Sequence, residues 1–153
     1  MSDSKQHGAQ AAFEKTLTGV SAAMSGANLI SGIGGLGTGL TFDFGLAVLD
    51  DEIVRIIRQF KSGIEVNQET LSKDIIHEIG PFGNFLSHDS TLLKMRSMSQ
   101  TCLFDRSNRE DWENKGKPQS YAKALSRAIE IIENHKPESL PESAIRRIRL
   151  IVE

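Results

Sequence analysis

The chain has little cysteine and no long apolar run. Cys102 is the only cysteine among 153 residues, so an internal disulfide and a thiolate metal cluster are both excluded. A chain without disulfides suits a reducing compartment, and we expect a cytoplasmic protein. No apolar run reaches the roughly 18 residues that a membrane span needs. Because the first residues are also polar, we expect neither a signal peptide nor a membrane partner.

The chain also lacks an excess of one charge. Its formal net charge is −2, whereas proteins that bind nucleic acid usually carry a basic face. We therefore expect no nucleic-acid partner. Hydrophobic residues make up 39% and charged residues 25% of the chain, which is ordinary for a soluble globular protein of about one domain.

Strands are scarce, and most of the chain has the apolar periodicity of helices. Thr41 and Asn67 are expected N-caps, and Gly63 and Gly80 are expected helix ends. The pattern predicts helices over about 11–25, 42–61, 68–79, 118–135 and 141–152, with short helical pieces near 90–95 and 108–115. The chain is thus expected to be predominantly α-helical.

A glycine-rich stretch over residues 26–39 is the most informative feature that is present. It holds six of the 13 glycines, and it includes a short apolar run over 27–30 that predicts a buried strand. A strand, a glycine-rich loop and a helix form a βα unit, in which glycine lets the backbone approach a ligand. One such unit cannot stand alone, so the sequence predicts the end of a larger α/β enzyme.

Residues 32–37 match the pattern G-x-G-x-x-G of dinucleotide-binding loops. Such a site needs glycines that open the helix directly and an acidic residue at the end of a second strand. Here the predicted helix begins only near Thr41, and the candidate acids Asp50 and Asp51 fall inside it. A plain loop between strand and helix is the favoured interpretation, and a small nucleotide-binding enzyme stays a minor alternative.

Other reactive residues have ordinary structural interpretations. The four histidines are not spaced as metal ligands with each other or with Cys102, so no metal site is expected. The sequence His88-Asp89-Ser90 suggests a hydrolytic cluster only superficially, and Asp89 or Ser90 is expected to cap a helix. The helix over 42–61 carries four acids near its start and middle: Asp43, Asp50, Asp51 and Glu52. Early acids are expected to interact favourably with the helix dipole, and the others to face water.

Several motifs, taken in order, resemble the C-terminal part of the trimethylamine methyltransferase family. Single motifs are weak, but the ordered set covers nearly the whole chain. The N-terminal motifs are Ser2-Asp3-Ser4-Lys5, Ala9-Gln10-Ala11, Glu14-Lys15-Thr16, Gly26-Ala27-Asn28-Leu29-Ile30 with Gly32 and Gly34, Thr41-Phe42-Asp43, and Leu49-Asp50-Asp51-Glu52-Ile53. The later ones are Gly80-Pro81-Phe82-Gly83-Asn84-Phe85-Leu86, Asp105-Arg106, and Trp112 with Gly116.

The resemblance implies a (β/α)₈ TIM barrel that moves a methyl group from a methylated or quaternary amine to the cobalt of a corrinoid (cobalamin) held by a partner protein. It implies no cofactor bound directly by this chain and no catalytic residue within it. Methanogen members carry a pyrrolysine, which this sequence lacks. A barrel takes about 250 residues, so we expect a fragment that is inactive alone. One explanation is a gene prediction that stopped at an in-frame amber codon.

In the complete protein, residues 1–62 would supply the last βα units and residues 63–153 a C-terminal helical extension. Asp3, Ser4 and Lys5 would lie at the end of a preceding strand, and Gly32, Gly34 and Gly35 would follow the strand over 27–30 at the active face. Both groups would face the substrate or the corrinoid. Exposed apolar helix faces lead us to expect a homo-oligomer. The alternative to an enzyme fragment is an independent helical protein-interaction module.

Overall fold

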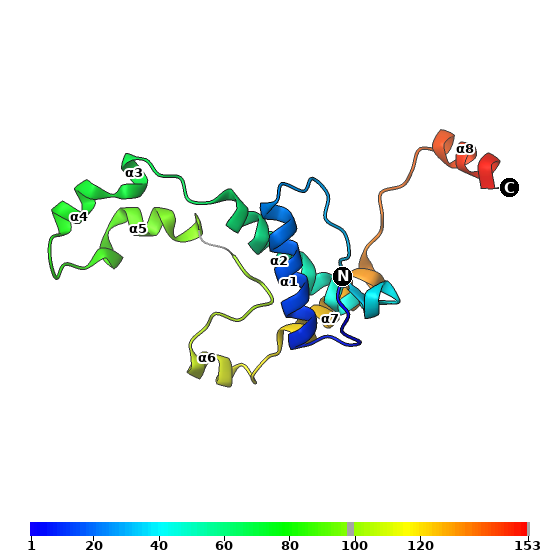
Figure 1. Cartoon of the computed structure of the whole chain (residues 1–153), viewed down its shortest axis with the longest axis horizontal. Coiled ribbons are helices and arrows are strands. Elements are labelled where there is room, and N and C mark those ends of the chain that lie inside the picture. Colours follow the sequence, from blue (N-terminus) through cyan, green and yellow to red (C-terminus); the bar gives the residue numbers. More distant parts are fainter. Residues whose placement is uncertain (98–99, 153) are drawn as a thin grey trace.

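The computed structural model describes residues 1–97 and 100–152. Three helices form its centre: α1 (Ala9–Met24), α2 (Phe44–Ser62) and α7 (Ser120–Asn134). Figure 1 shows α1, α2 and α7 together at the middle of an elongated molecule. These helices confirm the predictions over 11–25, 42–61 and 118–135, with ends that shift by a few residues, and the described chain is predominantly helical as expected.

The core is built where α2 lies between α1 and α7. One cluster joins Ala11 of α1, Leu36 and Leu46, with Leu49 and Tyr121 against it. A second cluster joins Ala23, Ile53 and Ile57, and Val20 and Phe104 pack against it. On the other side of α2, Gly45 permits close packing, because a Cβ there would lie 3.2 Å from the Cα of Leu125 on α7.

The strand predicted over 27–30 is wrong. The only strands in the described residues are β1 (Gly35–Leu36) and β2 (Thr41–Phe42), which pair antiparallel with Gly35 opposite Phe42. The short 3₁₀ turn η1 (Gly37–Gly39) reverses the chain between them. Residues 27–30 have no neighbouring strand to bond with, and Leu29 is 88% exposed. No barrel ladder is seen in the described chain, so the TIM barrel stays a prediction from the family resemblance.

The segment over 64–97, called the arm here, projects from the core to one side (Figure 1). It contains α3 (Gln68–Leu71), α4 (Lys73–Ile79), η2 (Phe85–Ser87), α5 (Asp89–Lys94) and η3 (Met95–Ser97). The single helix predicted over 68–79 is broken at Ser72, which adopts a left-handed conformation with φ 50°. The predicted cap is confirmed, because Asn67 and Thr70 form a reciprocal capping box.

Beyond the arm, α6 (Arg109–Asn114) precedes α7, and α8 (Glu142–Val152) follows it after an extended connection. α8 lies at the opposite end of the molecule from the arm (Figure 1). The helices predicted near 90–95, 108–115 and over 141–152 are therefore confirmed as α5, α6 and α8. In the described part of the chain, no helix combines the length and apolarity needed to cross a bilayer.

Candidate functional site

The structure brings the N-terminal residues and the glycine-rich loop together. The amide of Gly37 donates to the carbonyl of Ser4 at 2.8 Å, and the amide of Thr38 donates to the carbonyl of Ser2 at 3.1 Å. The Thr38 hydroxyl donates to Oδ1 of Asp3 at 2.9 Å. Two segments that are about 35 positions apart thus run side by side.

The three N-terminal site residues have different surroundings. Ser4 is buried, and its hydroxyl donates to the carbonyl of Gln6 at 2.7 Å. Asp3 and Lys5 are exposed, and the Lys5 ammonium donates to the Asp3 carbonyl at 2.8 Å. Only Asp3 and Lys5 therefore present charge to the surroundings of the loop.

The carboxylate of Glu14, on α1, anchors the N-terminal segment to this helix. It accepts hydrogen bonds from the Ser2 hydroxyl at 2.6 Å and from the Asp3 amide at 2.8 Å. The bond from Ser2, followed by those from Gln10 and the Asp3 amide, lowers the pKa of Glu14 from 4.5 to about 2. Glu14 therefore remains ionised at neutral pH and fixes the segment to the helix.

A buried ion pair between α1 and α2 anchors the glycine-rich loop. The Lys15 ammonium lies 2.5 Å from Oδ2 of Asp50, and both side chains are less than a tenth exposed. The same ammonium donates to the Gly32 carbonyl at 3.2 Å, and the Gly34 amide donates to Oδ2 of Asp50 at 2.8 Å. The expectation that Asp50 faces water is wrong, because its position on α2 turns it toward Lys15 of α1.

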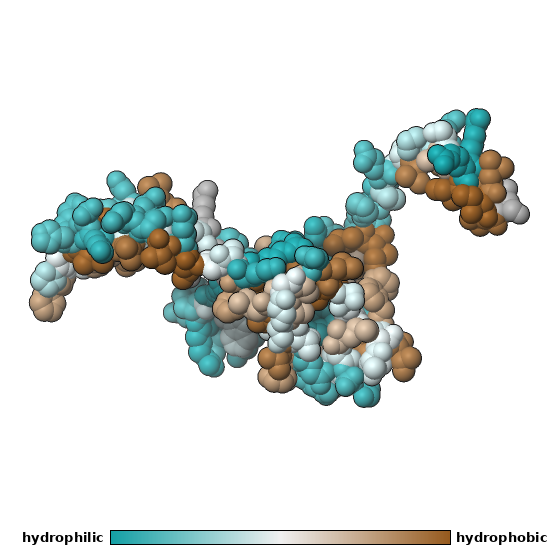
Figure 2. Space-filling model, turned by 45° about the horizontal axis from the view of Figure 1, so that its top comes forward, coloured by the Kyte–Doolittle hydropathy of each residue, from teal (hydrophilic) through white to brown (hydrophobic). Residues whose placement is uncertain are grey.

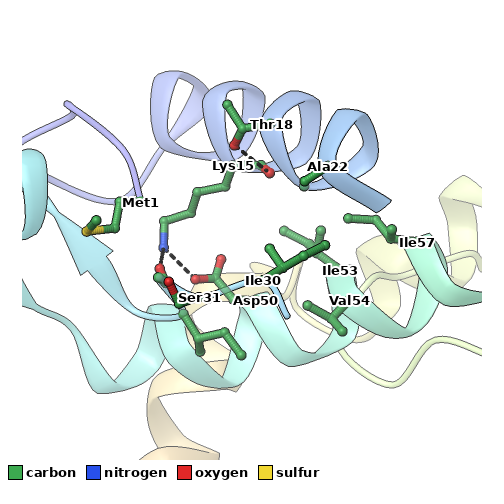
Figure 3. Close-up of a pocket in the computed structure, with 13 residues that line it drawn as sticks. Met1, Lys15, Thr18, Ala22, Ile30, Ser31, Asp50, Ile53, Val54 and Ile57 are labelled. Carbon is green, nitrogen blue, oxygen red and sulfur yellow. Dashed lines mark hydrogen bonds and ion pairs between the residues drawn. The ribbon is translucent and has the colours of Figure 1, made fainter. Parts of the chain in front are cut away.

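The ion pair borders a cavity of about 310 Å³ between α1, α2 and residues 30–33. Figure 3 shows Lys15 and Asp50 at one end, with Ile30, Ile53 and Ile57 toward the other. Oδ1 of Asp50 has no hydrogen-bond partner among the protein atoms. The cavity thus has largely apolar walls and the Lys15–Asp50 pair at one end.

The predicted site glycines lie against neighbouring side chains of the chain itself. Gly34 has φ +69°, and a Cβ there would lie 2.7 Å from the ring of Phe42. A Cβ on Gly32 would lie 2.6 Å from the backbone nitrogen of Met1, and one on Gly35 would lie 3.2 Å from the Met1 side chain. Met1 and Phe42 therefore occupy the space beside these glycines.

The loop lacks the geometry of a dinucleotide site. The amides of Gly34, Gly35 and Gly37 already donate to Asp50, Gly32 and Ser4, respectively. Helix α2 begins at Phe44, with Asp43 as N-cap, so Thr41 is not the cap that the sequence predicted. Because the loop amides are used and the helix starts well after them, phosphate groups have no helix N-terminus to bind at Gly32–Gly37.

No set of three or more potential metal ligands gathers in the part of the chain that the structure describes. His88 caps α5, because its ring Nδ1 accepts from the Ser90 amide at 3.1 Å. The prediction of Asp89 or Ser90 as the cap is therefore wrong.

The rings of His7 and Tyr121 are stacked, with their centroids 3.4 Å apart. The Tyr121 hydroxyl donates to Oδ2 of Asp43 at 2.9 Å. Burial, followed by this bond, raises the pKa of Tyr121.

The burial of two further charged residues was not predicted from the sequence. Lys15 follows Ala11 by four positions on the inner face of α1, where a charged side chain interrupts an apolar stripe. Glu52 was expected on a solvated face, but it is 6% exposed and accepts from the amides of Cys102, Leu103 and Phe104 at 2.8–3.1 Å. A charge on an otherwise apolar helix face was the signal available for Lys15.

Comparison with known proteins gives a consistent result along the whole chain. The trimethylamine methyltransferase (MTTB) family profile matches residues 1–152. A trimethylamine methyltransferase MttB of Desulfitobacterium hafniense is 46% identical over 99% of this chain and 30% of its own length. The Methanosarcina thermophila MttB is 32% identical over 95% of this chain and 30% of its own.

A glycine betaine methyltransferase of Desulfitobacterium hafniense is more distant, with 28% identity over 92% of this chain and 29% of its own length. The chain thus spans about 30% of the length of the curated relatives it matches. Because the family profile extends over nearly all of its residues, the chain belongs to the trimethylamine methyltransferase family.

Proposed function

We propose that this chain forms part of a methyltransferase that takes a methyl group from trimethylamine or a related methylated or quaternary amine. The observation that carries the proposal is the 46% identity to a trimethylamine methyltransferase over 99% of the chain. The glycine betaine methyltransferase among the relatives extends the substrate class to quaternary amines. The chain alone is expected to be inactive, since it corresponds to under a third of those proteins.

The proposed methyl acceptor is the Co(I) of a corrinoid carried by a partner protein. The C–N bond of a protonated tertiary amine or of a quaternary amine would break, and the methyl group would pass to cobalt as a methyl cation equivalent. Co(I) would supply the electron pair of the new bond and become methyl-Co(III), and the amine would leave neutral with the electron pair of the broken bond. The corrinoid supplies this chemistry, and the protein supplies binding and orientation. No described residue of this chain is assigned as a nucleophile.

Within that enzyme, the N-terminal segment and the glycine loop are proposed to border the pocket or the corrinoid. Their side-by-side arrangement supports this, as does the exposure of Asp3 and Lys5 at the loop. The Lys15–Asp50 pair and Glu14 would act as positioning residues, because each fixes the backbone of one segment.

A chimera tests the proposal directly. The matching C-terminal part of the Desulfitobacterium trimethylamine methyltransferase is replaced by this chain, and methyl transfer from trimethylamine to free cob(I)alamin is followed by the absorbance change at cobalt. We expect transfer by the chimera and none by the chain alone. A folded chimera, judged by circular dichroism against the parent enzyme, that transfers no methyl group from trimethylamine or glycine betaine contradicts the proposal.

The same assay tests the loop region. Lys5→Ala in the chimera should lower the transfer rate by about tenfold, because the loss of a side chain that helps to position the reactants slows the reaction. Lys61→Ala is the matched control, since Lys61 is an exposed lysine at the far end of α2. Equal rates for the two variants would remove Lys5 from the proposed site.

A further inference from the structure

Two amphipathic surfaces have no partner among the residues that the structure describes. The first is α8, in which no described residue is buried. Ile145, Ile148, Ile151 and Val152 recur at helical spacing and form one apolar stripe. At 100° per residue, Arg147 and Arg149 flank this stripe on its two sides, while Leu150 points to the opposite side of the helix.

The second surface is one side of the arm, residues 64–97. Figure 2 shows apolar side chains gathered along one side of the arm and hydrophilic ones along the other. No residue of the described α3, α4 or α5 is buried. The exposed apolar residues include Leu71, Ile76, Phe85, Leu86, Leu92 and Leu93, which are 42–83% exposed.

The two surfaces are complementary in charge. The arm carries five acidic and three basic residues, a net charge of −2, and α8 carries three arginines and one glutamate, a net charge of +2. An apolar stripe flanked by arginines thus matches an apolar face within an acidic segment. Such complementarity favours association of these two surfaces over association of either with itself.

The core lies between the arm and α8, which occupy opposite ends of the molecule (Figure 1). A second copy related by a twofold axis can place each α8 on the arm of the other, so that both surfaces of both copies are covered at once. An isologous arrangement of this kind closes on itself and contains the contact twice. We propose that α8 of one copy docks on the arm of a second copy, giving a reciprocal dimer.

Light scattering coupled to size exclusion, over a range of concentrations, tests this on the full chain. The expected result is a dimer that dissociates on dilution, and more readily at high salt because the charged flanks are screened. A monomer at every concentration overturns the proposal. Open-ended assemblies also overturn it, because reciprocal exchange between two copies must stop at the dimer.

A pair of neighbouring substitutions provides a matched control. Ile151 and Leu150 are both 84% exposed, but only Ile151 belongs to the stripe. Ile151→Asp should raise the dimer dissociation constant by about a hundredfold or more, because two apolar contacts are lost per dimer. Leu150→Asp introduces the same charge and should change it by less than about threefold. Equal effects of the two variants overturn the assignment of the face.

Mixing two impaired variants distinguishes exchange between copies from indirect effects. Leu92→Asp on the arm should also weaken the dimer. An Ile151→Asp chain mixed with a Leu92→Asp chain still has one intact α8 and one intact arm, on different copies. Both substitutions then fall in the second contact, which either one alone already breaks, so the mixed dimer keeps one whole contact and each single-variant dimer keeps none. The mixture should therefore dimerise more strongly than either variant alone. A mixture no stronger than its components overturns the reciprocal contact.

Discussion

Lys15 and Asp50 show how much the environment of a charged residue decides its energetic role. Their side chains are 6% and 7% exposed, whereas those of Asp51 and Arg55, which also form an ion pair, are 54% and 65% exposed. A buried pair that loses one member leaves an uncompensated charge, but an exposed pair loses little. Neighbouring aspartates on α2 thus belong to two different energetic classes.

Lys15→Met should therefore lower the free energy of unfolding by about 3–5 kcal/mol, because Asp50 would be left buried without its cation. Arg55→Met removes the cation of the exposed pair and should change it by about 0.5 kcal/mol or less. Urea denaturation of both variants measures the difference. Similar effects of the two substitutions would show that the Lys15–Asp50 pair is not buried as described.

Glu14 predicts a pH dependence for the N-terminal segment. Its pKa of about 2 in the folded chain lies below its ordinary value of 4.5, chiefly because of the hydrogen bond from Ser2. A depressed pKa means that its contribution to stability is present above pH 4.5 and is lost as the pH falls toward 2.

The chemical shift of the Asp3 amide, which donates to Glu14, should follow this titration with a midpoint near 2. A Glu14→Gln variant should show no such transition. A midpoint close to 4.5 in the unmodified chain would mean that the segment is not held by Glu14 in solution.

At the scale of elements, Glu52 fastens an irregular segment to a helix. Its carboxylate accepts from three successive amides over residues 102–104. Phe104 then packs against the cluster of Ala23, Ile53 and Ile57. One side chain on α2 therefore fixes a segment about 50 positions later and completes the second half of the core.

Glu52→Gln should destabilise the chain by about 1.5–3 kcal/mol, because an amide offers one acceptor oxygen and turns an N–H group toward backbone donors. The amides of residues 102–104 should then exchange with solvent faster. Asp51→Asn, which alters the exposed acid next to it, is the control and should leave their exchange unchanged. Unaltered protection in Glu52→Gln would contradict this anchoring role.

The helices were largely predictable because each carries its own signals. Apolar spacing located α1, α2 and α7, and Asn67 marked the start of α3. The break at Ser72 was not predictable, since serine has no special preference for a left-handed conformation. The strand over 27–30 failed because an apolar run becomes a strand only where another strand is available to bond with it.

At the scale of the whole molecule, the described chain consists of a helical core with two projections. The chain is irregular and exposed around Glu65, at the start of the arm, and around Glu138, before α8. Glu52, by contrast, is buried within the core. Exposed connections without secondary structure are the preferred sites of proteolysis.

A glutamate-specific protease at low dose should therefore cleave after Glu65 and Glu138 before it cleaves after Glu52. Mass spectrometry of early time points identifies the products, and a denatured sample in which all three sites are cleaved at similar rates provides the comparison. Early cleavage after Glu52 would contradict the division into a core and two projections.

The sequence by itself determined the helices, the absence of a disulfide, and the family to which the chain belongs, because these depend on local spacing, residue counts and ordered motifs. Only the tertiary structure decided which charges are buried. Lys15 meets Asp50, and Glu52 meets residues 102–104, across separations at which sequence spacing gives no distance. Burial depends on which helix faces meet, and that is fixed only when α1, α2 and α7 pack together.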